Sequence, residues 1–120
     1  RIGDIYYAMT KNYERMRENQ TTLPEEAKRE LKEMFELLAD SMKHTRNNFK
    51  LGQEGMSLEH INANEREINE KRLRIFNSHY RRLEKGIYEP AAGVAYLDLV
   101  NRLEKVGDHL VNINEALETL

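Results

Sequence analysis

Apolar side chains recur three and four residues apart along most of the chain, a spacing that places them on one face of an α-helix. Breaks in this pattern divide the chain into four segments. We expect helices near residues 1–19, 23–51, 57–86 and 90–119, and no β-strand. The pattern therefore predicts an all-α fold.

The predicted helices begin and end at residues that commonly start and stop helices. Thr22 as a cap with Glu25 three residues later, and Pro24 in the first turn, are typical of a helix start. Ser57 is the expected cap of the third helix, and Pro90 begins the fourth. The expected helix ends are marked by glycines at Gly52, Gly55 and Gly86.

The second predicted helix carries the clearest apolar stripe. Its members are Ala27, Leu31, Met34, Phe35, Leu38, Met42, Thr45 and Phe49. Helices with such stripes and short connections favour an antiparallel up-down four-helix bundle. The Gly and Pro breaks argue against the alternative of one continuous coiled coil.

Composition and charge exclude several classes of protein. The formal net charge is −2 without a basic stripe, so we expect no nucleic acid partner. Lys28-Arg29 and Arg81-Arg82 are interpreted as solvated helix faces. The absence of cysteine excludes disulfides, thiolate zinc sites and iron–sulfur clusters. No apolar run approaches the ~18–20 residues of a membrane span, so we expect no direct membrane insertion.

Polar residues interrupt the apolar face of the third predicted helix. That face contains Leu58, Ile61, Ile68, Phe76, Leu83 and Ile87. Glu65, Asn69 and Arg72 project into its middle, and a buried charge is costly unless it is paired or bound to an ion. Two explanations stay open: an interhelical salt-bridge network through Arg72, or a metal or anion site inside the bundle.

The fourth predicted helix has a polar stripe beside its apolar face, formed by Asn101, Glu104, Asp108, Asn112 and Glu115. Carboxylates at positions i and i+4 repel, whereas a hard divalent cation between them would reverse that sign. A hydrated flank is the alternative reading. Gly107 costs ~1 kcal/mol of helix propensity relative to Ala, which indicates close helix approach or space for a ligand.

A short internal repeat links the two ends of the chain. Arg1-Ile2-Gly3-Asp4 matches Lys105-Val106-Gly107-Asp108, and apolar residues follow both at the same steps. The segment from Tyr96 to Ile113, YLDLVNRLEKVGDHLVNI, resembles the signature helix of PhoU-like domains. These domains are tandem three-helix repeats, each ending in a helix with a Glu-x-x-x-Asp motif. The chain then corresponds to the last helix of one repeat plus one three-helix repeat, residues 1–120, as a fragment of a longer protein.

The resemblance also implies a site. PhoU motifs can hold metal clusters; Glu104 and Asp108 match one motif, and Glu65 and Asn69 match the other, with Asn where Asp is usual. We expect these residues to face one another across the bundle, with Asp4 close by. The expected ligand is a divalent metal such as Mg, Mn, Fe or Zn. In the alternative, Arg72 or Lys105 neutralises the carboxylates and the cluster is structural.

The functional expectation is a non-catalytic regulatory domain of phosphate transport. Residues 79–83 and 88–90 look most like PhoU domains fused behind sodium/phosphate cotransporter membrane regions. This implies a cytoplasmic domain at the inner face of the membrane, with the transporter region or a phosphate-uptake or signalling protein as partner. A stand-alone PhoU regulator and a helical scaffold with a salt-bridged core are the alternatives.

Two further expectations concern catalysis and assembly. No His has Glu three residues before it, as a di-iron oxidase requires, and no phosphate-binding Gly loop is present, so we expect no enzyme activity. Apolar surface on Ile2, Ile5 and Tyr6 is expected to favour homo-oligomers.

Overall fold

A computed structural model describes residues 23–52, 54–87 and 89–119, together with Asp4, Tyr7, Lys11 and Glu14. It contains the helices α2 (Glu25–Leu51), α3 (Glu59–Glu84) and α4 (Pro90–Glu118), and the described ranges hold no strand. The predicted all-α fold is confirmed. Each helix begins and ends within two residues of its predicted bounds.

The predicted first helix over residues 1–19 lies outside the described residues, apart from four positions. Asp4, Tyr7, Lys11 and Glu14 are helical and exposed. Three helices are therefore described where four were predicted, and the four-helix bundle stays a prediction. The expected self-association also stays a prediction, because Ile2, Ile5 and Tyr6 are outside the described residues.

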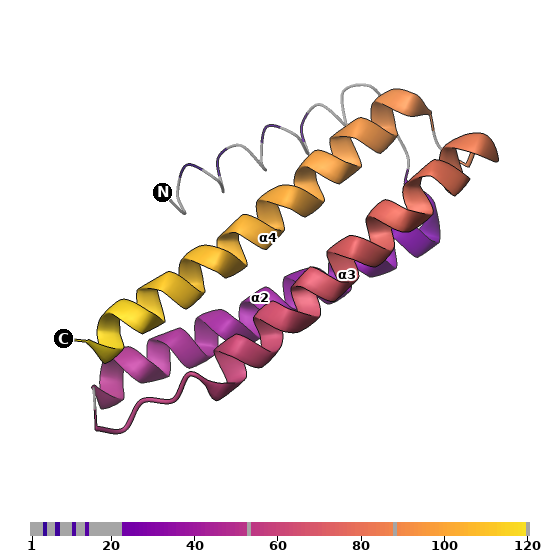
Figure 1. The fold of residues 1–120 in the computed structure, drawn as a ribbon. Coiled ribbons are helices and arrows are strands. Elements are labelled where there is room, and N and C mark those ends of the chain that lie inside the picture. The colour runs from indigo at the N-terminus through magenta and orange to yellow at the C-terminus, as the bar shows by residue number, and fades with distance from the viewer. Residues whose placement is uncertain are drawn as a thin grey trace.

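The helices α2, α3 and α4 run up, down and up along one another (Figure 1). Their apolar faces meet in one core, to which all three contribute. Tyr96 of α4 is fully buried, and its hydroxyl donates hydrogen bonds to the Ala27 carbonyl at 3.4 Å and to the Glu30 carboxylate at 3.1 Å. Buried aromatic residues need such a partner for their polar end, and this one connects α4 to α2.

The helix ends follow local sequence signals with two corrections. The first concerns α2, where Pro24, and not the predicted Thr22, occupies the cap position. Gly52 and Gly86 adopt positive φ angles of 71° and 65°, which favour glycine, and Pro90 is the first residue of α4. Ser57 is not the cap residue of α3, because Leu58 occupies that position. The Ser57 hydroxyl nevertheless accepts a hydrogen bond from the Glu59 N–H at 3.3 Å, so it satisfies one free donor of the first turn.

The apolar stripe of α2 is wider than the face that the helix buries. Met34 and Leu38 lie in the core, whereas Phe35, Met42 and Phe49 are 47%, 46% and 61% exposed. These three members of the predicted stripe therefore lie outside the core. In the described part of the chain, α2 packs against only two helices, which cover one side of it and leave the edge of the stripe uncovered.

Arg82 corrects a second expectation, since it is 3% exposed and not part of a solvated face. The buried residues Ile61, Ile68 and Ile75 of α3 recur every seven residues, and Arg82 occupies the next position of that row. A charge there needs a partner. Its guanidinium lies 2.7 Å from the Glu30 carboxylate of α2.

A buried polar network ties the opposite end of the bundle together. Asn114 of α4 is fully buried, donates to the Thr45 hydroxyl at 2.8 Å and accepts from the Asn48 amide at 2.7 Å. Asn48 also exchanges hydrogen bonds with the backbone of Ser57. A satisfied network of this kind fixes how α2 and α4 align.

Candidate metal centre

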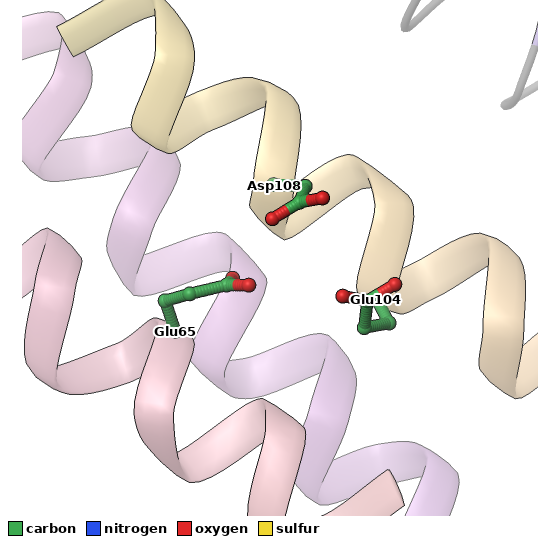
Figure 2. Close-up of side chains that lie close together, drawn as sticks. All are labelled: Glu65, Glu104 and Asp108. Carbon is green, nitrogen blue, oxygen red and sulfur yellow. The ribbon is translucent and has the colours of Figure 1, made fainter. Parts of the chain in front are cut away.

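Three carboxylates converge between α3 and α4. Glu65 extends from α3 towards Glu104 and Asp108, which lie one turn apart on α4 (Figure 2). One oxygen from each residue lies within 4.8 Å of the others. The structure thus brings together both helices' main predicted acidic residues.

Gly107 makes the close approach of Glu65 to α4 feasible. A Cβ atom at this position would lie 2.7 Å from Oε2 of Glu65, closer than van der Waals contact allows. The same atom would meet Ile68 Cδ1 at 3.4 Å and Leu38 Cδ2 at 3.6 Å. The space left by the missing side chain is therefore filled by the Glu65 carboxylate, with apolar groups from α3 and α2 beside it.

The environment of Glu65 disfavours its charged form. Burial, the charge of Asp108, a hydrogen bond that the protonated Glu65 carboxyl donates to Asp108, and the charge of Glu104 raise the pKa of Glu65 to about 7. Burial and the charge of Asp108 likewise raise the pKa of Glu104, against the opposing charges of Arg72 and Lys105. When Glu65 is ionised, its Oε2 is buried and has no hydrogen-bond donor among the described residues. An unpartnered acceptor among like charges is a position that a cation would stabilise.

Asn69 supports Glu65 from one turn along α3. Its amide donates to Oε1 of Glu65 at 3.4 Å, which lowers the pKa of that carboxyl. Where a PhoU motif usually has Asp, this chain has a neutral donor. Asn69 thus holds one Glu65 oxygen instead of adding a fourth charge.

Among the residues that the structure describes, Arg72 does not form the carboxylate salt bridge that was one of the two explanations left open by the sequence. Its Nε donates to the Asn101 side chain at 2.8 Å, and its guanidinium lies over the Phe76 ring, 5.1 Å from the centroid. Within the described ranges, neither Arg72 nor Lys105 forms an ion pair with the three carboxylates. The expected direct salt bridge is absent from this part of the chain.

Asp4 is helical and exposed, and the structure does not bring it into the carboxylate group. Among the described residues, the group consists of Glu65, Glu104 and Asp108. All three were predicted, from their helical phase together with the motif resemblance. Leu38, which also lies beside Gly107, was not among the predicted site residues, although its place in the stripe of α2 marks it as a core residue.

The donor set fits a hard divalent cation. Carboxylate oxygens are preferred by Mg²⁺ and Mn²⁺, and they also bind Fe²⁺. Zinc sites more often include His or Cys, which this group lacks. The unpartnered Glu65 oxygen and the raised pKa values of Glu65 and Glu104 are what such a cation would relieve.

The chain is thus a helical bundle with an acidic cluster between its last two described helices. Residues 31–117 match the PhoU domain family, and the chain belongs to that family, which is associated with the regulation of phosphate transport. The matched range includes both halves of the cluster. No curated protein and no solved structure matches the chain. No helix in the described ranges is long and apolar enough to cross a bilayer.

Proposed function

We propose that this PhoU domain is a non-catalytic regulatory module that binds a divalent cation at Glu65, Glu104 and Asp108. The observation that carries the proposal is the buried, unpartnered Oε2 of Glu65 beside two further carboxylates. Two like charges from α4 and one from α3 cost stability when the site lacks a cation. A bound cation would offset this repulsion, and its ligands would connect α3 to α4.

Cation binding connects the site to regulation through the packing of α3 on α4. Glu65 belongs to one helix, and Glu104 and Asp108 belong to the other, so occupancy stabilises the arrangement in which the three meet. A ligand shifts a conformational equilibrium only by its difference in affinity between the two states. Because the ligands come from two helices, the cation binds more tightly when α3 and α4 are packed together than when they are apart.

We further propose that the domain acts next to a sodium/phosphate cotransporter region, on the cytoplasmic side of the membrane, with that region or a phosphate-uptake or signalling protein as partner. The likeness of residues 79–83 and 88–90 to such fused domains supports this. A stand-alone PhoU regulator is the second candidate. The gene sequence upstream of Arg1 separates them: apolar spans are expected there, and a second complete PhoU repeat in their place would favour the stand-alone regulator.

Thermal unfolding tests the cation site. The chelator-treated protein is compared with samples containing Mg²⁺, Mn²⁺, Fe²⁺ or Zn²⁺, and a ligand at a hundred times its dissociation constant should stabilise it by ~2.7 kcal/mol. Glu104→Gln should abolish the response. Exposed Glu67→Gln on α3 is the matched control and should leave it unchanged. No response to any of the four ions would refute the cation site and leave the carboxylate group with a structural role only.

A further inference from the structure

The outward face of α2 carries a row of three large apolar side chains. Phe35, Met42 and Phe49 lie seven residues apart, so they align within about 40° on the helix surface. They are 47%, 46% and 61% exposed. The row extends over about 21 Å of helix. Isolated exposed apolar residues are ordinary, but an aligned set indicates an interaction surface.

Basic side chains run along one side of this row. At about 100° per residue they fall within about 80° of Phe35. All are exposed: Lys28, Lys32, Lys43, Arg46 and Lys50. Among the described residues, only Lys28 of this set forms an ion pair, with Glu25 at 3.3 Å.

The acidic side chains of α2 mostly point to the other side, where α3 satisfies them. Glu33 pairs with Lys71 at 2.6 Å, and Glu30 pairs with Arg82 at 2.7 Å. Asp40 accepts a hydrogen bond from Asn64. Most acids of α2 therefore lie towards α3, whereas the five bases are exposed; Glu25 and Glu36 are the exceptions, because they are exposed on the basic side of the helix. A chain of net charge −2 thus presents a local positive surface.

We propose that this face of α2, its apolar row and the five basic residues beside it, lies on an anionic lipid surface. Helices that rest in the membrane interface combine apolar side chains at the acyl boundary with Lys and Arg near the phosphates. Such a peripheral contact needs no spanning helix. Because α2 is one continuous helix of 27 residues, all eight side chains are presented along a single line.

A second copy of the chain fits this face less well than a lipid surface does. Two α2 helices meeting about Met42 would bring their basic rows towards each other, and like charges across an interface disfavour association. Anionic headgroups complement the same row. The half-exposed Phe35 and Phe49 project outward, which suits a deformable surface.

Cosedimentation of the full 120-residue chain with lipid vesicles tests the proposal. We expect binding to vesicles of phosphatidylcholine mixed with phosphatidylglycerol, little binding to phosphatidylcholine alone, and weaker binding as salt rises. The triple variant Lys43→Glu/Arg46→Glu/Lys50→Glu should bind about a hundredfold more weakly. Phe35→Ser/Met42→Ser/Phe49→Ser should lose at least about tenfold. Circular dichroism checks that both variants are folded.

The matched controls lie on α3 and its C-terminal cap residue, Lys85. Leu73→Ser/Tyr80→Ser removes apolar groups that are 58% and 72% exposed, and Arg81→Glu/Lys85→Glu reverses two exposed charges. These variants should bind vesicles like the unchanged chain, with and without chelator. Equal losses in the α3 controls would show unspecific adsorption and overturn the assignment of this face.

Three other results would also overturn the proposal. Anionic vesicles that leave the chain in solution at low salt would exclude a lipid surface and direct attention to an acidic protein partner. An apolar variant that binds as tightly as the unchanged chain would show that Phe35, Met42 and Phe49 take no part. Light scattering that finds a dimer, converted to monomer by the same variant, would assign the face to a second copy.

Discussion

The substitution Gly107→Ala should disturb the carboxylate cluster while leaving the stability of the fold nearly unchanged. The new methyl group would lie 2.7 Å from Oε2 of Glu65, so that carboxylate must move. It is the far end of a flexible side chain, and a side chain forced off its rotamer costs about 0.5–1.5 kcal/mol. Replacing Gly by Ala inside a helix returns about 1 kcal/mol. The two effects nearly cancel, so we expect the metal-free free energy of unfolding to change by at most about 1 kcal/mol.

The response to divalent ions should change far more than the metal-free stability. With Glu65 displaced, the cluster loses the carboxylate that α3 contributes among the described residues, and the stabilisation of ~2.7 kcal/mol expected at saturating ion should fall to a small fraction. Urea unfolding with chelator and with Mn²⁺ measures both quantities. Glu115→Ala, an exposed change further along α4, is the control and should keep the full response.

Two results would refute this reasoning. An unchanged Mn²⁺ response in Gly107→Ala would mean that Glu65 is not a ligand. A metal-free loss above about 2 kcal/mol, as overpacked cores show, would mean that Ile68 and Leu38 resist the methyl group and that the glycine serves helix packing.

Three further predictions concern single residues. The pKa of Glu65 is about 7 in the folded state against 4.5 for the free side chain, so its contribution to stability is lost as pH rises between those values. In metal-free urea unfolding, the unchanged chain should therefore lose stability relative to Glu65→Gln from pH 4.5 to 7.5. Parallel pH profiles of the two proteins would contradict this. Arg82→Ala leaves a partly buried carboxylate on α2 unpaired and should cost about 3 kcal/mol in denaturant unfolding, whereas exposed Arg81→Ala should stay within about 0.5 kcal/mol. Asn114→Ala removes the centre of a buried hydrogen-bond network and should cost about 2–3 kcal/mol; a calorimetric loss below about 0.5 kcal/mol would show that the network is dispensable.

Local signals predicted the helices well because each acts within one or two turns. Pro90 begins α4, and Gly52 and Gly86 take up positive φ angles at the ends of α2 and α3. The predicted cap of α3, Ser57, is one residue too early, because a serine hydroxyl can accept a backbone N–H hydrogen bond both at a helix cap and in the turn before it.

The site could be predicted in part for a related reason. Glu104 and Asp108 are one turn apart on any helix, and Glu65 lies in phase with the apolar face of α3, so helix packing brings the three together. The environment of Glu65 was not predictable, because it depends on how closely α3 approaches Gly107. The partner of Arg72 depends likewise on which side chain of α4 lies opposite.

Helical periodicity also does not say how many neighbours a helix has. The stripe of α2 includes Phe35 and Phe49, but only an additional neighbour would bury them. Arg82 shows the reverse case, since a charged residue occupies a buried position and is tolerated because Glu30 lies across from it. Both residues depend on tertiary arrangement, which a single-helix pattern does not contain.

Isothermal titration calorimetry measures directly whether a divalent cation binds between α3 and α4. Metal-free protein is titrated with Mn²⁺ and with Mg²⁺, followed by Glu65→Gln, Glu104→Gln and the exposed control Glu67→Gln. A divalent site between α3 and α4 predicts saturable binding that disappears in the first two variants and persists in the third. The absence of saturable binding, or binding that all three variants retain, would contradict it.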